Sequence, residues 1–79
     1  MYAAIDLGAG SGRAFLGRVT PHGLALDEVH RFTYAPRVCD GHLRWDVARL
    51  FDGLQTGLAA ARRSAAEFGG RLRSVGVDA

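Results

Sequence analysis

The stretch Asp6-Leu7-Gly8-Ala9-Gly10-Ser11-Gly12-Arg13 sets a carboxylate at the end of an apolar run and follows it with a glycine-rich turn. Residues 2–7 before the turn are apolar as in a buried strand, and residues 13–20 alternate as in a second strand. The stretch therefore predicts a β-hairpin. Successive backbone N–H groups in such a turn can surround an anion, and glycine lets the backbone approach it closely.

This hairpin is a candidate phosphate site. A Walker A loop is excluded because it requires a lysine, which the chain lacks, and a dinucleotide fingerprint is excluded because it opens a helix rather than a strand. Ser11 would add a hydroxyl donor and Arg13 a forked cation suited to phosphate. The alternative interpretation is an ordinary strand connection, because glycine-rich turns with an aspartate are common between strands.

The length and composition indicate at most one small domain. A chain of 79 residues buries only about 60 to 65% of its unfolded surface. Hydrophobic residues make up 48% of the chain and charged residues 23%, which is a globular composition. The sequence has no apolar run long enough to span a bilayer and no signal-peptide pattern after Met1, so we expect a cytoplasmic location.

The charges and the single cysteine argue against several kinds of site. All ten basic residues are arginine, against eight acids, and they are spread along the chain, so we expect no nucleic-acid groove. Cys39 has no second cysteine to pair with, and we expect a free thiol in a loop. The three histidines are scattered and lack the spacing of a zinc site.

The next segments predict a third strand and a loop. Thr20-Pro21-His22-Gly23 is a turn signal, and residues 33–42 have no clear period, as in a loop. Residues 24–32 alternate as a strand in which one face would carry Leu24, Leu26, Glu28, His30 and Phe32.

A helix follows, with Asp46 as its N-cap and Gly69-Gly70 as its stop. Two glycines inside it, Gly53 and Gly57, each cost about 1 kcal/mol relative to alanine and so predict close packing on the sheet. The apolar residues follow the stripe of an amphipathic helix, namely Val47, Leu50, Phe51, Leu54, Leu58, Ala61, Ala65 and Phe68.

Residues 72–77 alternate as a last strand, which gives the order β-β-β-α-β. A strand that follows such a helix normally runs parallel to an earlier strand, and functional groups gather beyond its carboxyl end. Asp78 lies there, either as a functional acid or as a plain chain-end acid. We expect these 79 residues to be the beginning of a longer protein, and the last strand to expose an unpaired edge that favours aggregation.

Four blocks of the chain together indicate a family. They are Ala4-Ile5-Asp6-Leu7-Gly8-Ala9-Gly10-Ser11-Gly12-Arg13, Glu28-Val29-His30-Arg31-Phe32, Gly41-His42-Leu43-Arg44-Trp45-Asp46-Val47 and Ser74-Val75-Gly76-Val77-Asp78. In this order they resemble the FGGY family of carbohydrate kinases, whose domains have the actin-like, ribonuclease-H-like ATPase fold. Within that family the likeness is greatest to the rhamnulokinases. The resemblance implies an α/β fold in which residues 1–79 are a partial N-terminal kinase domain, the remainder and the C-terminal domain lying beyond them.

The resemblance also implies a reaction, transfer of the γ-phosphoryl group of ATP to the 1-hydroxyl of L-rhamnulose with Mg²⁺ as cofactor. Kinases of the same family that act on xylulose or glycerol are the alternative. On this analogy Asp6 holds the hydrated Mg²⁺, and the ATP phosphate loop consists of Ala9, Gly10, Ser11, Gly12 and Arg13. The partners implied are a small sugar and ATP, with no nucleic acid or membrane.

The family's general base and a sugar-contacting glycine would lie beyond residue 79. We therefore assign no catalytic residue in this chain and expect no kinase turnover from it alone. The other hypothesis is a non-catalytic remnant or binding module of the same fold, which would hold nucleotide weakly at best. An actin-like or chaperone ATPase shares the hairpin but lacks the Arg44-Trp45-Asp46 block.

The sequence departs from the family pattern at one position within the quoted blocks and at one position just after a block. Tyr34 stands where the family usually has asparagine, and Gly10 replaces a commoner serine. Neither change removes a backbone donor from the turn. We expect Trp45 to pack the preceding loop onto the core and His30 to be a packed or hydrogen-bonded histidine rather than a catalytic one.

Overall fold

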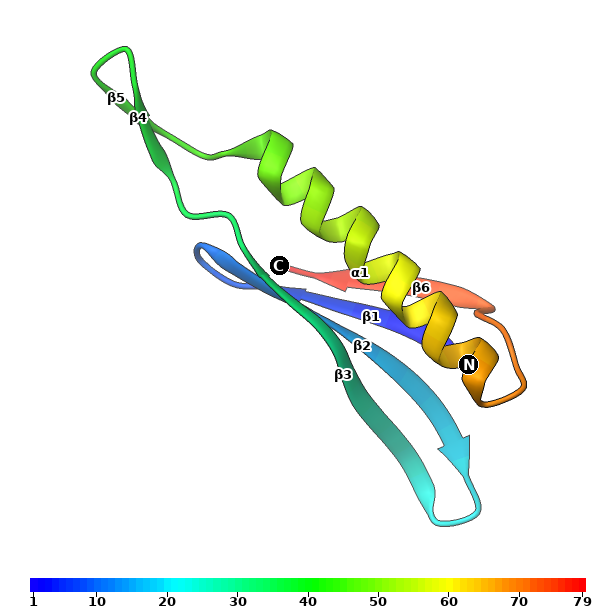
Figure 1. The fold of residues 1–79 in the computed structure, drawn as a ribbon. Helices are drawn as coiled ribbons and strands as arrows, with labels where there is room; N and C mark the ends of the chain where they lie inside the picture. The colour runs from blue at the N-terminus through cyan, green and yellow to red at the C-terminus, as the bar shows by residue number, and fades with distance from the viewer.

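A computed structural model describes residues 1–36, 38 and 40–79 of the chain. The predicted order β-β-β-α-β is present, but part of the expected loop 33–42 and the residues after it form a short extra hairpin, β4–β5 (Figure 1). Asp40 and Gly41 at its tip both have positive φ, which closes a tight turn. The hairpin was not predicted because residues 33–42 show no regular alternation of apolar and polar residues. The elements are β1 (Tyr2–Leu7), β2 (Ser11–Thr20), β3 (Gly23–Thr33), β4 (Arg37–Cys39), β5 (His42–Arg44), α1 (Val47–Glu67) and β6 (Ser74–Asp78).

In the described part of the chain, four strands form a mixed sheet in the order β3-β2-β1-β6. The first three strands are antiparallel, and β6 runs parallel to β1, as the sequence predicted. Helix α1 lies over one face of this sheet, against β3, β2 and β1 (Figure 1). The fold is thus a mixed α/β unit in which β6 forms an edge.

The contact between α1 and the sheet is made by small residues. Gly53, Gly57, Ala61 and Ala65 follow one another at four-residue intervals and are the buried residues of the helix. A Cβ atom on Gly57 would lie 3.0 Å from the Cβ of Ala14, and one on Gly53 would overlap the Phe32 ring. These distances confirm the predicted close packing at the two glycines.

The predicted apolar stripe of α1 is confirmed in the second half of the helix, where Ala61 and Ala65 are buried, and wrong in the first half. There Val47 and Phe51 are exposed, and the buried residues are Gly53 and Gly57. Close approach favours the face whose side chains are smallest, because larger ones would hold the helix away from β2 and β3. The core is accordingly small, and its buried hydrophobic residues are Ala3, Ile5, Ala14, Leu16, Tyr34, Ala61 and Ala65.

The predicted shared face of the third strand was also wrong. An irregularity in the β2–β3 register lies between Ala14, which pairs with His30, and Phe15, which pairs with Glu28. The extra residue there, Val29, acts as a β-bulge and reverses the alternation. His30 therefore lies on the side of α1, whereas Glu28 and the residues before it that alternate with it lie on the opposite side.

The ends of α1 are set by the predicted signals. The side chain of Asp46 accepts a hydrogen bond from the Arg49 backbone N–H at 3.1 Å, as an N-cap does. Gly69 has a φ of 75°, which stops the helix just after the C-cap Phe68. The last strand begins at Ser74, two residues later than the alternation suggested.

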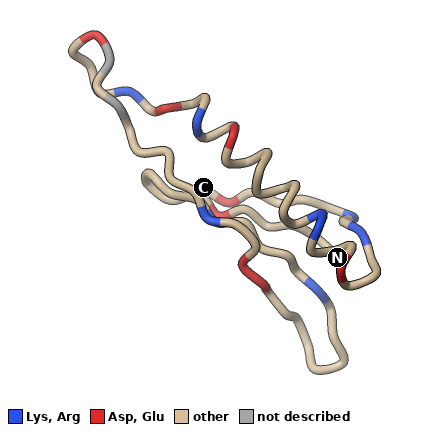
Figure 2. The backbone as a smooth tube through the Cα atoms, viewed as in Figure 1, with Lys and Arg blue, Asp and Glu red and all other residues tan. Residues whose placement is uncertain are grey.

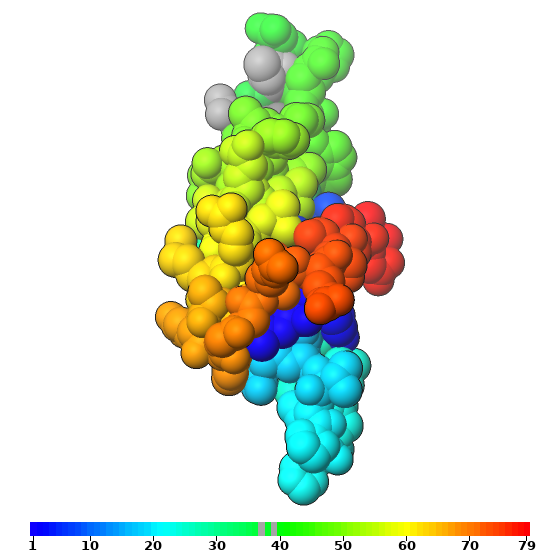
Figure 3. Space-filling model, turned by 90° about the vertical axis from the view of Figure 1, so that its right-hand side faces the viewer, coloured from blue at the N-terminus to red at the C-terminus, as the bar shows by residue number. Residues whose placement is uncertain are grey.

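The molecule is elongated, with principal extents of 53 × 19 × 16 Å. The β2–β3 end projects from the body in one direction and the region of β5 in the other (Figures 1 and 3). Within the described residues no helix is both long and apolar enough to cross a membrane. The expectation for Cys39 lies outside the described residues.

Candidate functional site

The tip of the β1–β2 hairpin is a short turn closed by a backbone bond from Gly8 N–H to the Ser11 carbonyl, at 2.8 Å. Gly10 has a φ of 95°, a conformation that L side chains rarely adopt, so this turn requires glycine there. The N–H of Gly8 is occupied within the turn. Any anion held by backbone N–H groups here must therefore use those of the following residues.

A cavity of about 440 Å³ opens beside this turn, and we call it the hairpin cavity. Alternation along the strands places Ser11, Arg13 and Asp6 on the sheet face opposite α1, because the residues between them pack toward the helix. Asp6 and three of the five predicted phosphate-loop residues thus meet in one place, whereas Ala9 and Gly10 do not line the cavity. The lining residues are Asp6, Gly8, Ser11, Gly12, Arg13, Arg31 and Thr33.

Ion pairs surround the hairpin cavity. Arg13 Nη2 lies 3.0 Å from Asp6 Oδ2, across neighbouring strands, and both side chains are about half exposed. Arg31 lies 3.0 Å from Glu28 on its own strand. Acidic and basic residues gather at this end of the sheet, near the C-terminus (Figure 2). The two arginines give the cavity a forked donor from each of two adjacent strands.

Tyr34 supports the β1–β2 turn through two hydrogen bonds. Its hydroxyl donates a hydrogen bond to the carbonyl of Gly8, and its backbone N–H donates to the carbonyl of Gly10 at 2.9 Å. The side chain is only 7% exposed, and its ring centroid lies 5.8 Å from that of Trp45. This contact of Tyr34 was not predicted from the sequence, where the one available signal was the departure of Tyr34 from the family pattern.

Trp45 and His30 behave largely as expected. Trp45 packs on Tyr34 while its own side chain stays about half exposed, so it covers the buried tyrosine without being buried itself. His30 is stacked on Phe32 with the ring centroids 5.9 Å apart, on the side of α1. The prediction of a packed His30 is confirmed.

Packing against the Phe32 ring, rather than close approach of a ligand, accounts for the glycine at position 12. A Cβ atom there would overlap the ring of Phe32, which crosses from β3 toward α1. Its backbone φ is not positive. Gly12 and Gly53 therefore hold the Phe32 ring between them, and this packing fixes β3 beside the hairpin.

Asp78 lies beside Asp6. The two residues are register partners on the parallel strands β6 and β1, so their side chains leave the same face of the sheet at the carboxyl ends of both strands. Among the described residues no group of three or more histidine, cysteine or acidic side chains is placed to hold a metal ion. A hydrated Mg²⁺ needs only one or two carboxylates.

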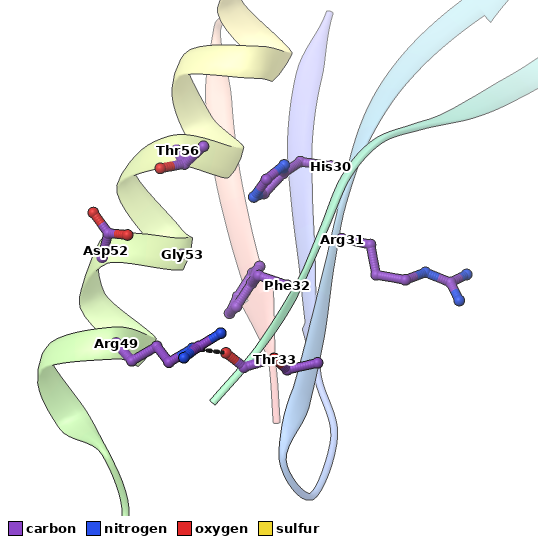
Figure 4. Close-up of a pocket in the computed structure, with 8 residues that line it drawn as sticks. All are labelled: His30, Arg31, Phe32, Thr33, Arg49, Asp52, Gly53 and Thr56. Atoms are coloured by element: carbon purple, nitrogen blue, oxygen red, sulfur yellow. Dashed lines mark hydrogen bonds between the residues drawn. The ribbon is translucent and has the colours of Figure 1, made fainter. Parts of the chain in front are cut away.

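A second cavity, of about 680 Å³, lies between β3 and the first turns of α1 (Figure 4). Arg49 closes one end of it, because its Nε donates to the Thr33 carbonyl at 2.9 Å. His30 and Phe32 point into the space between strand and helix, while the Arg31 side chain extends away from α1 (Figure 4). Arg31 thus reaches the hairpin cavity on the other face of the sheet.

Comparison with known proteins gives one consistent result. The chain is 44% identical over 62 residues to a rhamnulokinase of Lactiplantibacillus plantarum, a match covering 78% of this chain and 13% of the relative. It is 38% identical over 78 residues to one of Mannheimia succiniciproducens and 35% identical over 78 residues to one of Bacillus subtilis, with 96% and 99% of this chain covered. The chain spans about 15% of the length of these two relatives. No protein-family model matches it.

Proposed function

Because the chain is similar over nearly its whole length to an N-terminal part of rhamnulokinases, we propose that it is the phosphate-binding portion of an ATP-dependent sugar kinase of the FGGY type. The parent enzyme would transfer the γ-phosphoryl group of ATP to the 1-hydroxyl of L-rhamnulose. Residues 1–79 would then be a partial N-terminal domain of that enzyme. The observation that carries this proposal is the hairpin cavity, with a hydroxyl, two guanidinium groups and a carboxylate around it.

The turn and its flanking residues would hold the phosphates of ATP. Phosphoryl transfer needs positioning and charge neutralisation rather than covalent chemistry by the protein. Ser11 and Arg13 supply donors on the cavity side, and the N–H groups of Ala9 and Gly10 are the backbone donors that we assign to the phosphate chain. Gly12 pairs with Phe32 in the β2–β3 ladder and contributes by lining the cavity. The ion pair with Asp6 keeps the Arg13 guanidinium at the cavity wall, where it can bind a phosphate.

Asp6 would hold the hydrated Mg²⁺, with Asp78 as its neighbour. Both are carboxylates, which suit a hard cation that keeps most of its waters. When bound, Mg²⁺ would neutralise charge on the phosphates of ATP. The half-exposed position of Asp6 leaves room for those waters.

The strand order supports the ribonuclease-H-like assignment of the domain. Three antiparallel strands, then a helix and a strand parallel to the first, form the sheet β3-β2-β1-β6. In open sheets with parallel strands, ligands bind outside the carboxyl ends of the strands. The carboxyl end of β1, where Asp6 lies, borders the hairpin cavity, and Asp78 lies at the carboxyl end of the neighbouring strand β6.

The test is to sequence the gene beyond codon 79 and to assay the protein encoded by the full open frame with ATP and three acceptors, L-rhamnulose, xylulose and glycerol. We expect ADP release that depends on L-rhamnulose. Turnover of xylulose or glycerol without L-rhamnulose would overturn the substrate, and a stop codon at position 80 would leave a non-catalytic remnant.

A further inference from the structure

Two arginines face one another at the hairpin cavity, and only one of them, Arg13, belongs to the proposed phosphate loop. Arg13 on β2 and Arg31 on β3 are register partners on antiparallel strands, on the face opposite α1. Like charges directly opposite each other on a sheet are destabilising. Each arginine is paired with a carboxylate, Arg13 with Asp6 and Arg31 with Glu28, and an anion bound between them would further reduce the repulsion between the two guanidinium groups.

Neither arginine uses all of its N–H donors on its carboxylate. Asp6 accepts a single hydrogen bond from Arg13, through Nη2 at 3.0 Å. Glu28 accepts from Nε and Nη2 of Arg31 at 3.2 and 3.0 Å, both on one oxygen. Each guanidinium has five N–H donors, so each keeps donors for an anion. The Arg31 side chain is 66% exposed, which leaves it free to turn toward a ligand.

A second pair of donors lies nearer the tip of the hairpin. Ser11 and Thr33 are register partners two residues from the arginine pair, and both line the same cavity. Two residues along a strand correspond to about 6.7 Å. The cavity wall therefore carries a row of two hydroxyls and, about 6.7 Å further along, a row of two guanidinium groups.

We propose that Arg31 is the second cation of this site, with Thr33 as an added hydroxyl donor, and that the site takes a chain of two or more phosphoryl groups rather than a single phosphate. This inference rests on the proposed phosphate-binding function. A single phosphate can contact one row or the turn, whereas a polyphosphate can contact both rows and both strands. An orthophosphate held at the turn and the hydroxyl row leaves the arginine row unoccupied. Arg13 and Arg31, which share that row, then both favour a polyphosphate over orthophosphate.

The test is an NMR titration of the isotope-labelled chain with orthophosphate, pyrophosphate and tripolyphosphate at constant ionic strength. Backbone amides of Gly10 and Gly12 report on the turn, and the Nε–Hε signals of Arg13 and Arg31 report on the two cations. We expect affinity to rise from orthophosphate to tripolyphosphate. Arg31→Gln should lower the affinity for tripolyphosphate about tenfold, as for the loss of one charge-assisted contact, and that for orthophosphate less than about twofold.

Arg62→Gln is the matched control, because it removes the same charge from an exposed position on α1, away from the cavity. It should leave tripolyphosphate affinity within about twofold of the wild-type value, as expected for a screened distant charge. Arg31→Lys keeps the charge without the fork and should fall between wild type and Arg31→Gln.

The outcomes separate this inference from the proposed function. If the glycine amides shift but Arg31→Gln binds tripolyphosphate as Arg62→Gln does, Arg31 has no role and the phosphate turn stands. If the Arg31 signal shifts while the glycine amides do not, the two-arginine site stands and the phosphate turn is wrong. If no signal moves with any of the three anions, both are wrong.

Discussion

Two of the tight hairpins in this chain, β1–β2 and β4–β5, differ in the residues that support them. The β1–β2 turn has Gly10 at positive φ, and Tyr34 binds two of its carbonyls from a buried position. The β4–β5 turn has Gly41 at positive φ, but the described residues of that hairpin are exposed, and it stands away from the sheet (Figure 1). The difference indicates that a glycine turn becomes a candidate binding site when a third strand supports it and adds side chains to its open face.

The largest expected difference is in stability. Leu16 in β2 is fully buried, whereas Leu43 in β5 is 71% exposed. Leu16→Ala should lower the free energy of unfolding by about 2 to 5 kcal/mol, and Leu43→Ala should change it by less than about 0.5 kcal/mol. Urea unfolding followed by circular dichroism measures both. An equal loss in the two variants would mean that β4–β5 is packed as firmly as β1–β2.

Substitutions of the two turn glycines should separate effects on stability from effects on phosphate binding. Gly10→Ala and Gly41→Ala both force alanine into a left-handed conformation and should each cost about 1 to 2 kcal/mol of stability. Only Gly10→Ala should also weaken tripolyphosphate binding, because only that turn borders the hairpin cavity. Unfolding curves and a phosphate titration on both variants provide the comparison. Equal loss of binding in the two variants would contradict it.

Tyr34→Phe removes the hydroxyl that reaches Gly8 while keeping the ring. We expect a loss of about 1 kcal/mol, the usual net value of one hydrogen bond. Amide exchange at Gly8, whose N–H closes the turn, should quicken about fivefold if that energy holds the turn closed. The matched control is Tyr2→Phe, since the Tyr2 ring packs over Gly17, away from the turn. Unchanged exchange in Tyr34→Phe would show that the tyrosine does not hold the turn.

The smallest effect is expected at the ion pair beside the turn. Arg13→Gln removes the half-exposed pair with Asp6 and should cost about 0.2 to 1 kcal/mol. The loss should shrink as salt is added, because exposed charges are screened. Arg44→Gln on β5 should cost less than about 0.5 kcal/mol at any salt concentration. A salt-independent loss at Arg13 would show that its contribution is packing rather than charge.

Much of this architecture is predictable from local signals. The Asp46 cap, the glycine stop after α1 and the glycine-rich turn between β1 and β2 depend on a few neighbouring residues, and each lies where the sequence indicated. The parallel return of β6 beside β1 follows from general rules of chain connection.

What the sequence did not predict depends on contacts between distant residues. The bulge at Val29 reverses the faces of β3, and no composition signal marks it. The contact face of α1 is chosen by how closely Gly53 and Gly57 approach Phe32 and Ala14, which a hydrophobic stripe does not reveal. Arg31 enters the hairpin cavity only through pairing of β3 with β2, so periodicity along one strand could not place it there.

The most direct test of the central claim is a spectrum of the wild-type chain titrated with tripolyphosphate, in which the Gly10 and Gly41 amides are followed together. Both glycines sit at hairpin tips with positive φ, so general effects of salt on turns act on both. We predict a saturable shift at Gly10 and at the signals of Arg13 and Arg31, with Gly41 unchanged. Equal shifts at Gly10 and Gly41, or none at Gly10, would contradict the assignment of the β1–β2 hairpin as a phosphate site.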